Sequence, residues 1–419
     1  MKNFKYHHIF LITIFTNILF SLLFPRPLFV LDAEEYHTYA SNILNGNRLE
    51  VFPDGRPLHP LRPPMYPIFI SFLYFLFGIH KLPLYLAQIF LNGFISILIY
   101  NLSMRIFDDR NSALLSSILF SIHLPTLVHT AIYYPEILFS FSLIILVTTT
   151  YKAFKKPSFY KFLILGFIMG LTALVKPVVQ FLPIVIFPIL FFYLDSKKWK
   201  AILYTLGLII TFFITMTPWI IRNYIVYDTF IFCDTTGGLN LYTSNYVLEM
   251  TDDMPEKSGP MLPMTEEIRK MAMDESIEWP ERDRIYYQEA IKMIKKHPKK
   301  MLWVTLVRVG NYFTGLKQRN LLYNIGYPTG VVFSERVNDL VVNICAGMNI
   351  IFLLLALISI FCFFDKMILK ESMFLIILII YFTSIHSISN AFSRYSIAVF
   401  PYIIIFAGHG LSKLFLRKL

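Results

Sequence analysis

Three carboxylates stand together directly after the first long apolar run of the sequence. Asp32, Glu34 and Glu35 lie in the stretch FVLDAEEYHTYASNILNGN, residues 29 to 47. Any of the three could act as a general base and take a proton from a hydroxyl group in a transfer reaction. The spacing Asp-x-x-Glu also matches a capping box, in which the two side chains satisfy backbone N–H groups at the start of a helix. From this segment alone, both interpretations stay open, and so does the choice among the three acids.

Arginines stand at three other points where an apolar run begins or ends. Arg62 opens LRPPMYPIFISFLYFLFG, Arg222 follows MTPWII, and Arg394 precedes the last apolar run. An arginine at such a place can simply extend its charged head to the membrane interface. Three of them would also suit one anionic headgroup, because a guanidinium matches the geometry of phosphate. We therefore take all three as candidate phosphate ligands.

A fourth acid, Glu136, follows a proline in the stretch YYPEILFSF. An acid in the first turn of a helix complements the helix dipole, which is reason enough for its presence. An ionisable group at the mouth of a membrane span also often lines a polar cavity. Both roles remain open for Glu136.

The composition identifies the kind of molecule in which these side chains lie. Of 419 residues, 56% are hydrophobic and 16% are charged, and apolar runs of membrane-spanning length recur from end to end. The sequence therefore predicts an all-α protein with many membrane spans. Its formal net charge of +11 comes from Lys and Arg in short clusters between apolar runs. Such clusters are typical of cytoplasmic loops, so nucleic-acid binding is not expected.

The three cysteines, Cys233, Cys345 and Cys362, form no close-spaced metal-binding pattern.

Apolar runs and basic loops predict about ten spans with both termini in the cytoplasm. The first run lacks a small-residue cleavage site, so we interpret it as a retained span. A twelve-span alternative requires residues 321 to 335 to re-enter the membrane. The ten predicted spans lie near residues 8–30, 83–104, 112–127, 136–151, 160–176, 177–194, 201–220, 341–364, 372–388 and 395–412.

This topology leaves two long external segments, residues 32–82 and 221–340. We expect three parts: an N-terminal transmembrane catalytic module (1–220), an external and interfacial segment (221–340), and C-terminal transmembrane helices (341–419). In the first loop, Asp32 should begin a helix that stops at Gly46. A short interfacial helix should follow Arg62-Pro63-Pro64. In the second segment, Gly237-Gly238 predicts a tight turn, and residues 301–316 predict an amphipathic helix at the outer interface.

Taken together, these stretches resemble the GT-C-fold membrane glycosyltransferases. The resemblance is to the bacterial branch related to dolichyl-phosphate-mannose–protein mannosyltransferases and to the lipid A aminoarabinose transferase. It extends over nearly the whole chain. The stretches that carry it are LDAEEYHTYASNILNG, LRPPMYPIFISFLYFLFG, YYPEILF, GLTALVKPVVQFLP, TPWIIRNYIVYDTFIFCDTTGGLNLYTSN and SRYSIAVFPYIIIFAG.

The resemblance implies transfer of a sugar from a polyisoprenyl-phosphate donor to an acceptor at the outer face of the plasma (inner) membrane. It implies that Asp32 is the catalytic carboxylate, although the adjacent acids of this chain leave Glu34 and Glu35 as alternatives. Lys176, in LVKP, stands where relatives would carry an arginine, and it keeps the positive charge without the bidentate fork. The sequence identifies no certain cofactor and leaves a divalent metal open. Residues expected to line the substrate groove are Tyr66, Glu136, Asn223, Asn240 and Tyr395.

The chemistry of such a transfer is consistent with these side chains. A phosphate leaving group is already a stable anion, so it needs cations rather than a general acid, and one carboxylate can accept the acceptor's proton. The acceptor could be a lipid, a glycan or a protein. One alternative is a polymerase or ligase of lipid-linked saccharides. Another is a transporter or flippase, which would favour charged residues near the middle of spans. His123, Lys176 and His386 lie at or near predicted span ends instead.

Overall fold

The computed structural model describes residues 6–23, 32–49, 62–130, 132–193, 198–249, 264–274, 276–315 and 335–415. The regular elements within these ranges are α-helices and short 3₁₀ helices. The all-α fold class is therefore confirmed for this part of the chain. The possible re-entrant segment at 321–335 and the predicted end of the first span fall largely outside the described residues.

The first half of the chain supplies the helices that surround the first acidic stretch. They are α1 (Tyr6–Leu23), α2 (Asp32–Asn45), α3 (Met65–Phe77), α4 (Leu82–Phe107), α5 (Arg110–Ser121), α6 (Leu124–Thr130), α7 (Glu136–Lys155), α8 (Phe159–Ala173), η1 (Pro177–Phe181), α9 (Leu182–Tyr193) and α10 (Lys198–Tyr227).

The second half supplies a group of shorter helices and then the last long ones. They are α11 (Gly237–Asn245), η2 (Tyr246–Leu248), α12 (Glu266–Met273), α13 (Trp279–Lys296), α14 (Pro298–Thr314), α16 (Glu335–Phe363), α17 (Lys366–Ile388), η3 (Ser393–Ala398) and α18 (Phe400–Phe415).

Among the described residues, six helices are long and apolar enough to cross a membrane, and α5 with α6 forms a seventh candidate that is bent by 50°. Four shorter apolar helices are also present, and one of them, α3, is the predicted interfacial helix. The other three, in α8, η1–α9 and α18, fall within predicted spans. Each of the ten predicted spans therefore contains an apolar helical segment, and the protein is a multi-pass membrane protein. The bend at α5–α6 was not predicted.

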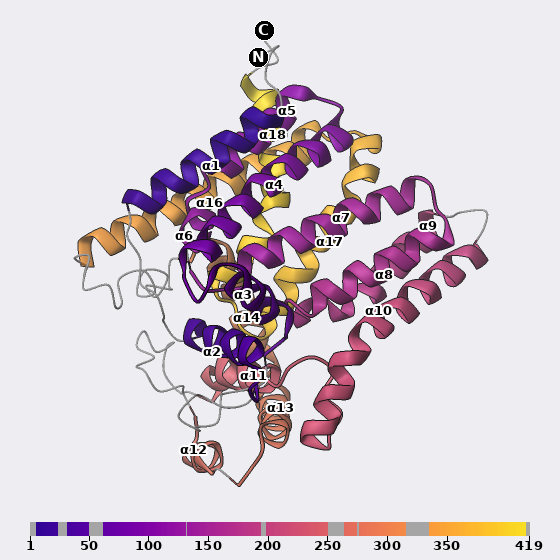
Figure 1. Ribbon diagram of the computed structural model, residues 1–419. Helices are drawn as coiled ribbons and strands as arrows, with labels where there is room; N and C mark the ends of the chain where they lie inside the picture. The colour runs from indigo at the N-terminus through magenta and orange to yellow at the C-terminus, as the bar shows by residue number, and fades with distance from the viewer. Residues whose placement is uncertain are drawn as a thin grey trace.

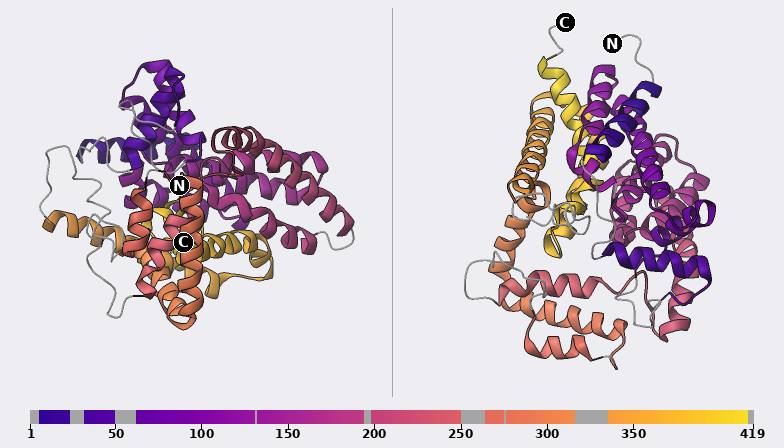
Figure 2. Two further views of the ribbon diagram at one scale, coloured as in Figure 1. Left: turned by 90° about the horizontal axis from the view of Figure 1, so that it is seen from below. Right: turned by 60° about the vertical axis from the view of Figure 1, so that its left-hand side comes forward.

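The start of α1 and the end of α18 lie at one end of the molecule (Figure 1). The opposite end is built by α2 and by α11 to α13 (Figure 1; Figure 2, right). These helices take part in two smaller hydrophobic clusters. One joins α2 and α3 to α1, α4, α6 and α16 and includes Tyr36 and Tyr66, and the other joins α11 to α13 and α14. The largest cluster runs through the long helices, so the end that carries α2 is built on a packed bundle.

Two local predictions at this end are confirmed. Helix α2 begins at Asp32 and is followed by Gly46 at φ +67°, a left-handed conformation that glycine adopts readily. Helix α3 begins directly after Pro63-Pro64, and the Met65 N–H donates to the Leu174 carbonyl at 3.1 Å. That bond fixes the start of α3 against the segment that carries Lys176.

The predicted tight turn at Gly237-Gly238 is wrong. The two glycines form the first turn of α11, which packs against α13. A Cβ at Gly237 would lie 2.0 Å from the Tyr287 hydroxyl, and one at Gly238 would lie 2.2 Å from the Asp283 carbonyl oxygen. The glycines are therefore needed for close contact between two helices rather than for a chain reversal.

Candidate active site

One carboxylate joins segments from the two ends of the chain. Asp32 Oδ1 accepts a hydrogen bond from Arg62 at 3.0 Å, and its Oδ2 accepts one from Arg394 at 2.9 Å. Asp32 is the first residue of α2, Arg62 precedes α3, and Arg394 lies in η3. The three side chains are 17–24% exposed, so these ion pairs are largely shielded from water. The structure thus brings together two of the three predicted phosphate-binding arginines around the predicted catalytic acid.

The other two acids of the stretch differ from Asp32 in their surroundings. Glu35 lies one turn further along α2, and its Oε2 accepts hydrogen bonds from Arg62 Nε at 2.9 Å and from the same guanidinium's terminal nitrogen at 2.7 Å. Glu34 points to another side of the helix and is exposed. The geometry therefore ranks Asp32 first, Glu35 second and Glu34 last as members of this ion-pair network.

A second ion pair lies at the start of α7. Glu136 Oε1 accepts a hydrogen bond from Lys176 Nζ at 2.9 Å, and the Glu136 side chain is only 3% exposed. Its other oxygen, Oε2, is buried and has no hydrogen-bond partner among the described residues. A buried carboxylate oxygen without a partner is costly, so this oxygen is well placed to accept a hydrogen bond from a bound ligand.

Tyrosine rings lie against the cations of both ion-pair groups. Lys176 Nζ lies 4.7 Å from the centre of the Tyr395 ring, and the Arg394 guanidinium carbon lies 5.1 Å from the same ring. Arg394 also lies 4.8 Å from the ring of Tyr134, and Arg62 lies 5.7 Å from the ring of Tyr36. Such cation–π contacts hold a positive charge in place without neutralising it.

Of the three tyrosines that contact these cations, one was predicted from the sequence as a site residue. That residue is Tyr395. Tyr134 and Tyr36 were not predicted, although Tyr134 is part of the motif YYPE and Tyr36 follows the acidic stretch. Tyr66, predicted to line the groove, is fully buried and sets its ring at 88° to the ring of Tyr36.

The electrostatics of the Asp32 cluster favour the charged forms. Burial alone would raise the pKa of Asp32, but the charges of Arg62 and Arg394 and their hydrogen bonds outweigh it and hold that pKa well below its usual range. Burial would lower the pKa of Arg62, whereas Asp32 and Glu35 raise it well above the usual value. Asp32 is therefore a carboxylate at any physiological pH, with a low affinity for protons while both arginines hold it.

The predicted site residues of the segment after Pro218 lie outside this network. Arg222 donates to the Asn223 side-chain oxygen at 3.1 Å, and its guanidinium lies 5.0 Å from the ring of Trp219. Burial raises the pKa of the Tyr39 hydroxyl in α2, and the positive charge of Arg222 acts against this shift. Asn240 accepts a hydrogen bond from Asn390 at 3.2 Å.

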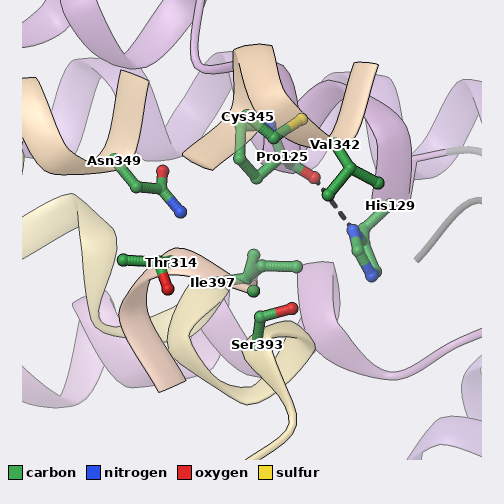
Figure 3. A pocket seen from close by; sticks show the side chains of 9 residues that line it. Pro125, His129, Thr314, Val342, Cys345, Asn349, Ser393 and Ile397 are labelled. Carbon is green, nitrogen blue, oxygen red and sulfur yellow. Dashed lines mark hydrogen bonds between the residues drawn. The ribbon is translucent and has the colours of Figure 1, made fainter. Parts of the chain in front are cut away.

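A small cavity lies next to the cluster, between α6, α16, η3 and the end of α14 (Figure 3). Its wall includes Ser393, the neighbour of Arg394, and His129. The Nδ1 of His129 donates a hydrogen bond to the Pro125 carbonyl at 2.9 Å. Within the described ranges, no three His, Cys, Asp or Glu side chains are grouped in a way that could hold a metal ion.

Comparison with known proteins supports the resemblance read from the sequence. The family model described as dolichyl-phosphate-mannose-protein mannosyltransferase matches residues 61–221, which is less than half of the chain. The predicted resemblance is confirmed over this range. Arg62, Tyr66, Glu136 and Lys176 lie inside it, whereas Asp32 and Arg394 lie outside it.

The crystal structure of ArnT from Cupriavidus metallidurans bound to undecaprenyl phosphate is also similar to this chain. The two are 10% identical, the match covers 97% of this chain and 76% of that one, and the TM-score is 0.42. No curated protein matches the sequence.

Proposed function

We propose that this protein transfers a sugar from a polyprenyl-phosphate donor to a hydroxyl-bearing acceptor at the outer face of the membrane. The observation that carries the proposal is the position of Asp32, whose two oxygens are held by arginines from opposite ends of the chain. The family match over residues 61–221 supports the reaction class. The acceptor is a lipid, a glycan or a protein.

The cations of the cluster would bind the donor phosphate. Arg62, Arg394 and Lys176 together carry three positive charges, and Asp32, Glu35 and Glu136 balance them. The Nε of Arg394 is buried and, among the described residues, has no hydrogen-bond partner. That N–H can donate to a phosphate oxygen without giving up the bond to Asp32. Arg222, beside α2, would add charge at the edge of this site.

Asp32 would act as the general base. The acceptor hydroxyl attacks the anomeric carbon, the bond from that carbon to the phosphate oxygen breaks, and the phosphate leaves with the electron pair. The hydroxyl proton passes to the Asp32 carboxylate. The negative charge of the bound phosphate would offset the arginine charges, so Asp32 would lose part of the stabilisation that lowers its pKa. Donor binding would thereby make Asp32 a stronger base.

Glu136 and the tyrosines would shape the sugar site. The Oε2 of Glu136 would accept a hydrogen bond from a hydroxyl group of the sugar or of the acceptor. Because Tyr66 is fully buried against Tyr36, it would support the wall of the groove rather than contact substrate. The site lies toward the end opposite both termini, which agrees with an external active site if the termini are cytoplasmic (Figure 1).

Purified protein supplied with a radiolabelled polyprenyl-phosphate sugar and its acceptor tests this proposal. Asp32→Asn should lower the transfer rate by about 10²- to 10⁴-fold, the range of general-base contributions. Glu34→Gln is the matched control, because Glu34 is exposed and should leave the rate nearly unchanged. A folded Asp32→Asn protein that keeps most of its activity would exclude Asp32 as the base.

A further inference from the structure

Three aromatic rings, one from α14, one from α17 and one from η3, form a stack beside the cations of the site. The ring of His386, near the end of α17, lies 4.7 Å from that of Tyr395 with 23° between the ring planes. On α14, the Tyr312 ring lies 5.5 Å from His386 at 18°. Both pairs are therefore close to parallel. Tyr312 is fully buried, so the far end of the stack is fixed by the surrounding protein.

A hydrogen bond also links the two ends of the stack. The Tyr312 hydroxyl donates to the backbone carbonyl of Tyr395 at 3.2 Å. Tyr395 is thus held twice, through its ring by His386 and through its backbone by Tyr312. Since η3 carries both Arg394 and Tyr395, this hold extends to the segment that supplies an arginine to Asp32.

The ring of Tyr395 is in turn the surface that both cations contact. Lys176 Nζ lies 4.7 Å from its centre, and Arg394 lies 5.1 Å from it and donates to the Tyr395 hydroxyl at 3.2 Å. A cation–π contact depends on the cation lying over the face of the ring. A rotation of this one ring would disturb Lys176 and Arg394 together.

We propose that His386 and Tyr312 are positioning residues that set the orientation of Tyr395 and, through it, the placement of Lys176 and Arg394. This inference rests on the proposed function, because those cations are the expected ligands of the donor phosphate. It assigns α14 a part in donor binding although no α14 side chain belongs to the ion-pair network. The long external segment that includes α14 is thereby connected to the donor site.

The test compares two substitutions of one residue. His386→Phe keeps a flat ring in the stack, whereas His386→Ala removes it. In steady-state transfer assays at varied donor concentration, His386→Ala should raise the KM for the polyprenyl-phosphate sugar about 5- to 30-fold, the range expected for one to two lost cation–ring contacts. The kcat should change less, because Asp32 is untouched. His386→Phe should restore most of the donor affinity.

A second substitution covers the case in which His386→Ala does not fold. Tyr312→Phe removes only the hydroxyl that holds the Tyr395 backbone, and it should raise the donor KM with little change in the thermal midpoint. Equal donor KM values for wild type, His386→Ala and Tyr312→Phe would overturn the inference. So would a loss in kcat alone, or no recovery in His386→Phe. If the wild-type protein itself neither binds nor uses the donor, the proposed function fails, and this inference fails with it.

Discussion

Replacing Arg62 by lysine keeps the positive charge of the site but removes its planar fork. Arg62 makes three hydrogen bonds to two carboxylates: one to Asp32 at 3.0 Å and two to Glu35 at 2.7 and 2.9 Å. A lysine ammonium is a compact charge on a flexible stem and cannot reproduce this arrangement. Arg62→Lys should therefore lose the hydrogen bonds to one of the two carboxylates, although Asp32 would still be held by Arg394.

The size of the effect follows from these contacts. A hydrogen bond to a charged group contributes about 1.5–3 kcal/mol. The side chains are 12–24% exposed, so water and ions screen part of this energy. We expect a net loss of about 1–3 kcal/mol in transition-state stabilisation, which is about 5- to 150-fold in kcat/KM.

Arg394→Lys is the matched comparison. Arg394 holds Asp32 through one terminal nitrogen at 2.9 Å, a contact that a lysine can keep, but a lysine has no Nε–H to offer the donor phosphate. Arg394→Lys should therefore lower kcat less than Arg62→Lys does, and its main effect should be a higher KM for the donor. Both variants are assayed for sugar transfer under the same conditions, after thermal unfolding has shown that they are folded. Full activity in Arg62→Lys, or a larger loss of kcat in Arg394→Lys, would refute the assigned role of the fork.

Three other substitutions test the electrostatics and packing of the scaffold. Arg308 is buried and donates to Asn245 and to backbone carbonyls at the ends of α11 and α17, so Arg308→Lys should cost about 2–4 kcal/mol of stability. Arg284→Gln removes an exposed ion pair and should leave the thermal midpoint nearly unchanged, and thermal unfolding compares the two variants. In Gly166→Ala the new Cβ would lie 2.2 Å from a backbone carbonyl of α10, so this variant should lose thermal stability, while Gly347→Ala, with open space at that position, should not. Burial raises the pKa of Asp283 from 3.8 to about 6, so the Asp283 side chain favours folding at low pH, and this contribution is lost as the pH rises toward and through 6. Asp283→Asn should therefore raise the thermal midpoint, relative to wild type, by more at pH 7.5 than at pH 4.5. An equal change at both pH values would contradict this assignment.

The local elements of the site could be predicted because their signals lie within a few residues. The start of α2 at Asp32, its end at Gly46 and the start of α3 after two prolines all follow from backbone preferences of neighbouring residues. The spans followed from runs of apolar residues for the same reason. The bend between α5 and α6 was missed, although the sequence carries a local signal for it. His123 and Pro125 interrupt the apolar run where the two helices meet.

The pairing of charges could not be predicted, because it depends on contacts between distant segments. Asp32 and Arg394 are 362 residues apart, and Glu136 and Lys176 are 40 residues apart. The sequence supplied a set of acids and bases near one predicted face of the membrane without assigning partners. The role of Gly237 also depends on a distant segment. A pair of glycines is typical of turns, but here Gly237 allows α11 to pack closely against Tyr287 of α13.

The pairing changes what the first acidic stretch can do. An acid whose two oxygens are both held by arginines is ionised but binds a proton weakly, so before the donor arrives Asp32 chiefly holds Arg62 and Arg394 in place. A donor phosphate adds negative charge to a cluster of three acids and three cations that is already balanced. In the proposed reaction, the phosphate and Asp32 would both contact the same two guanidinium groups. The proton affinity of Asp32 would then rise when the donor is bound, and this would couple activation of the base to occupancy of the site by the donor.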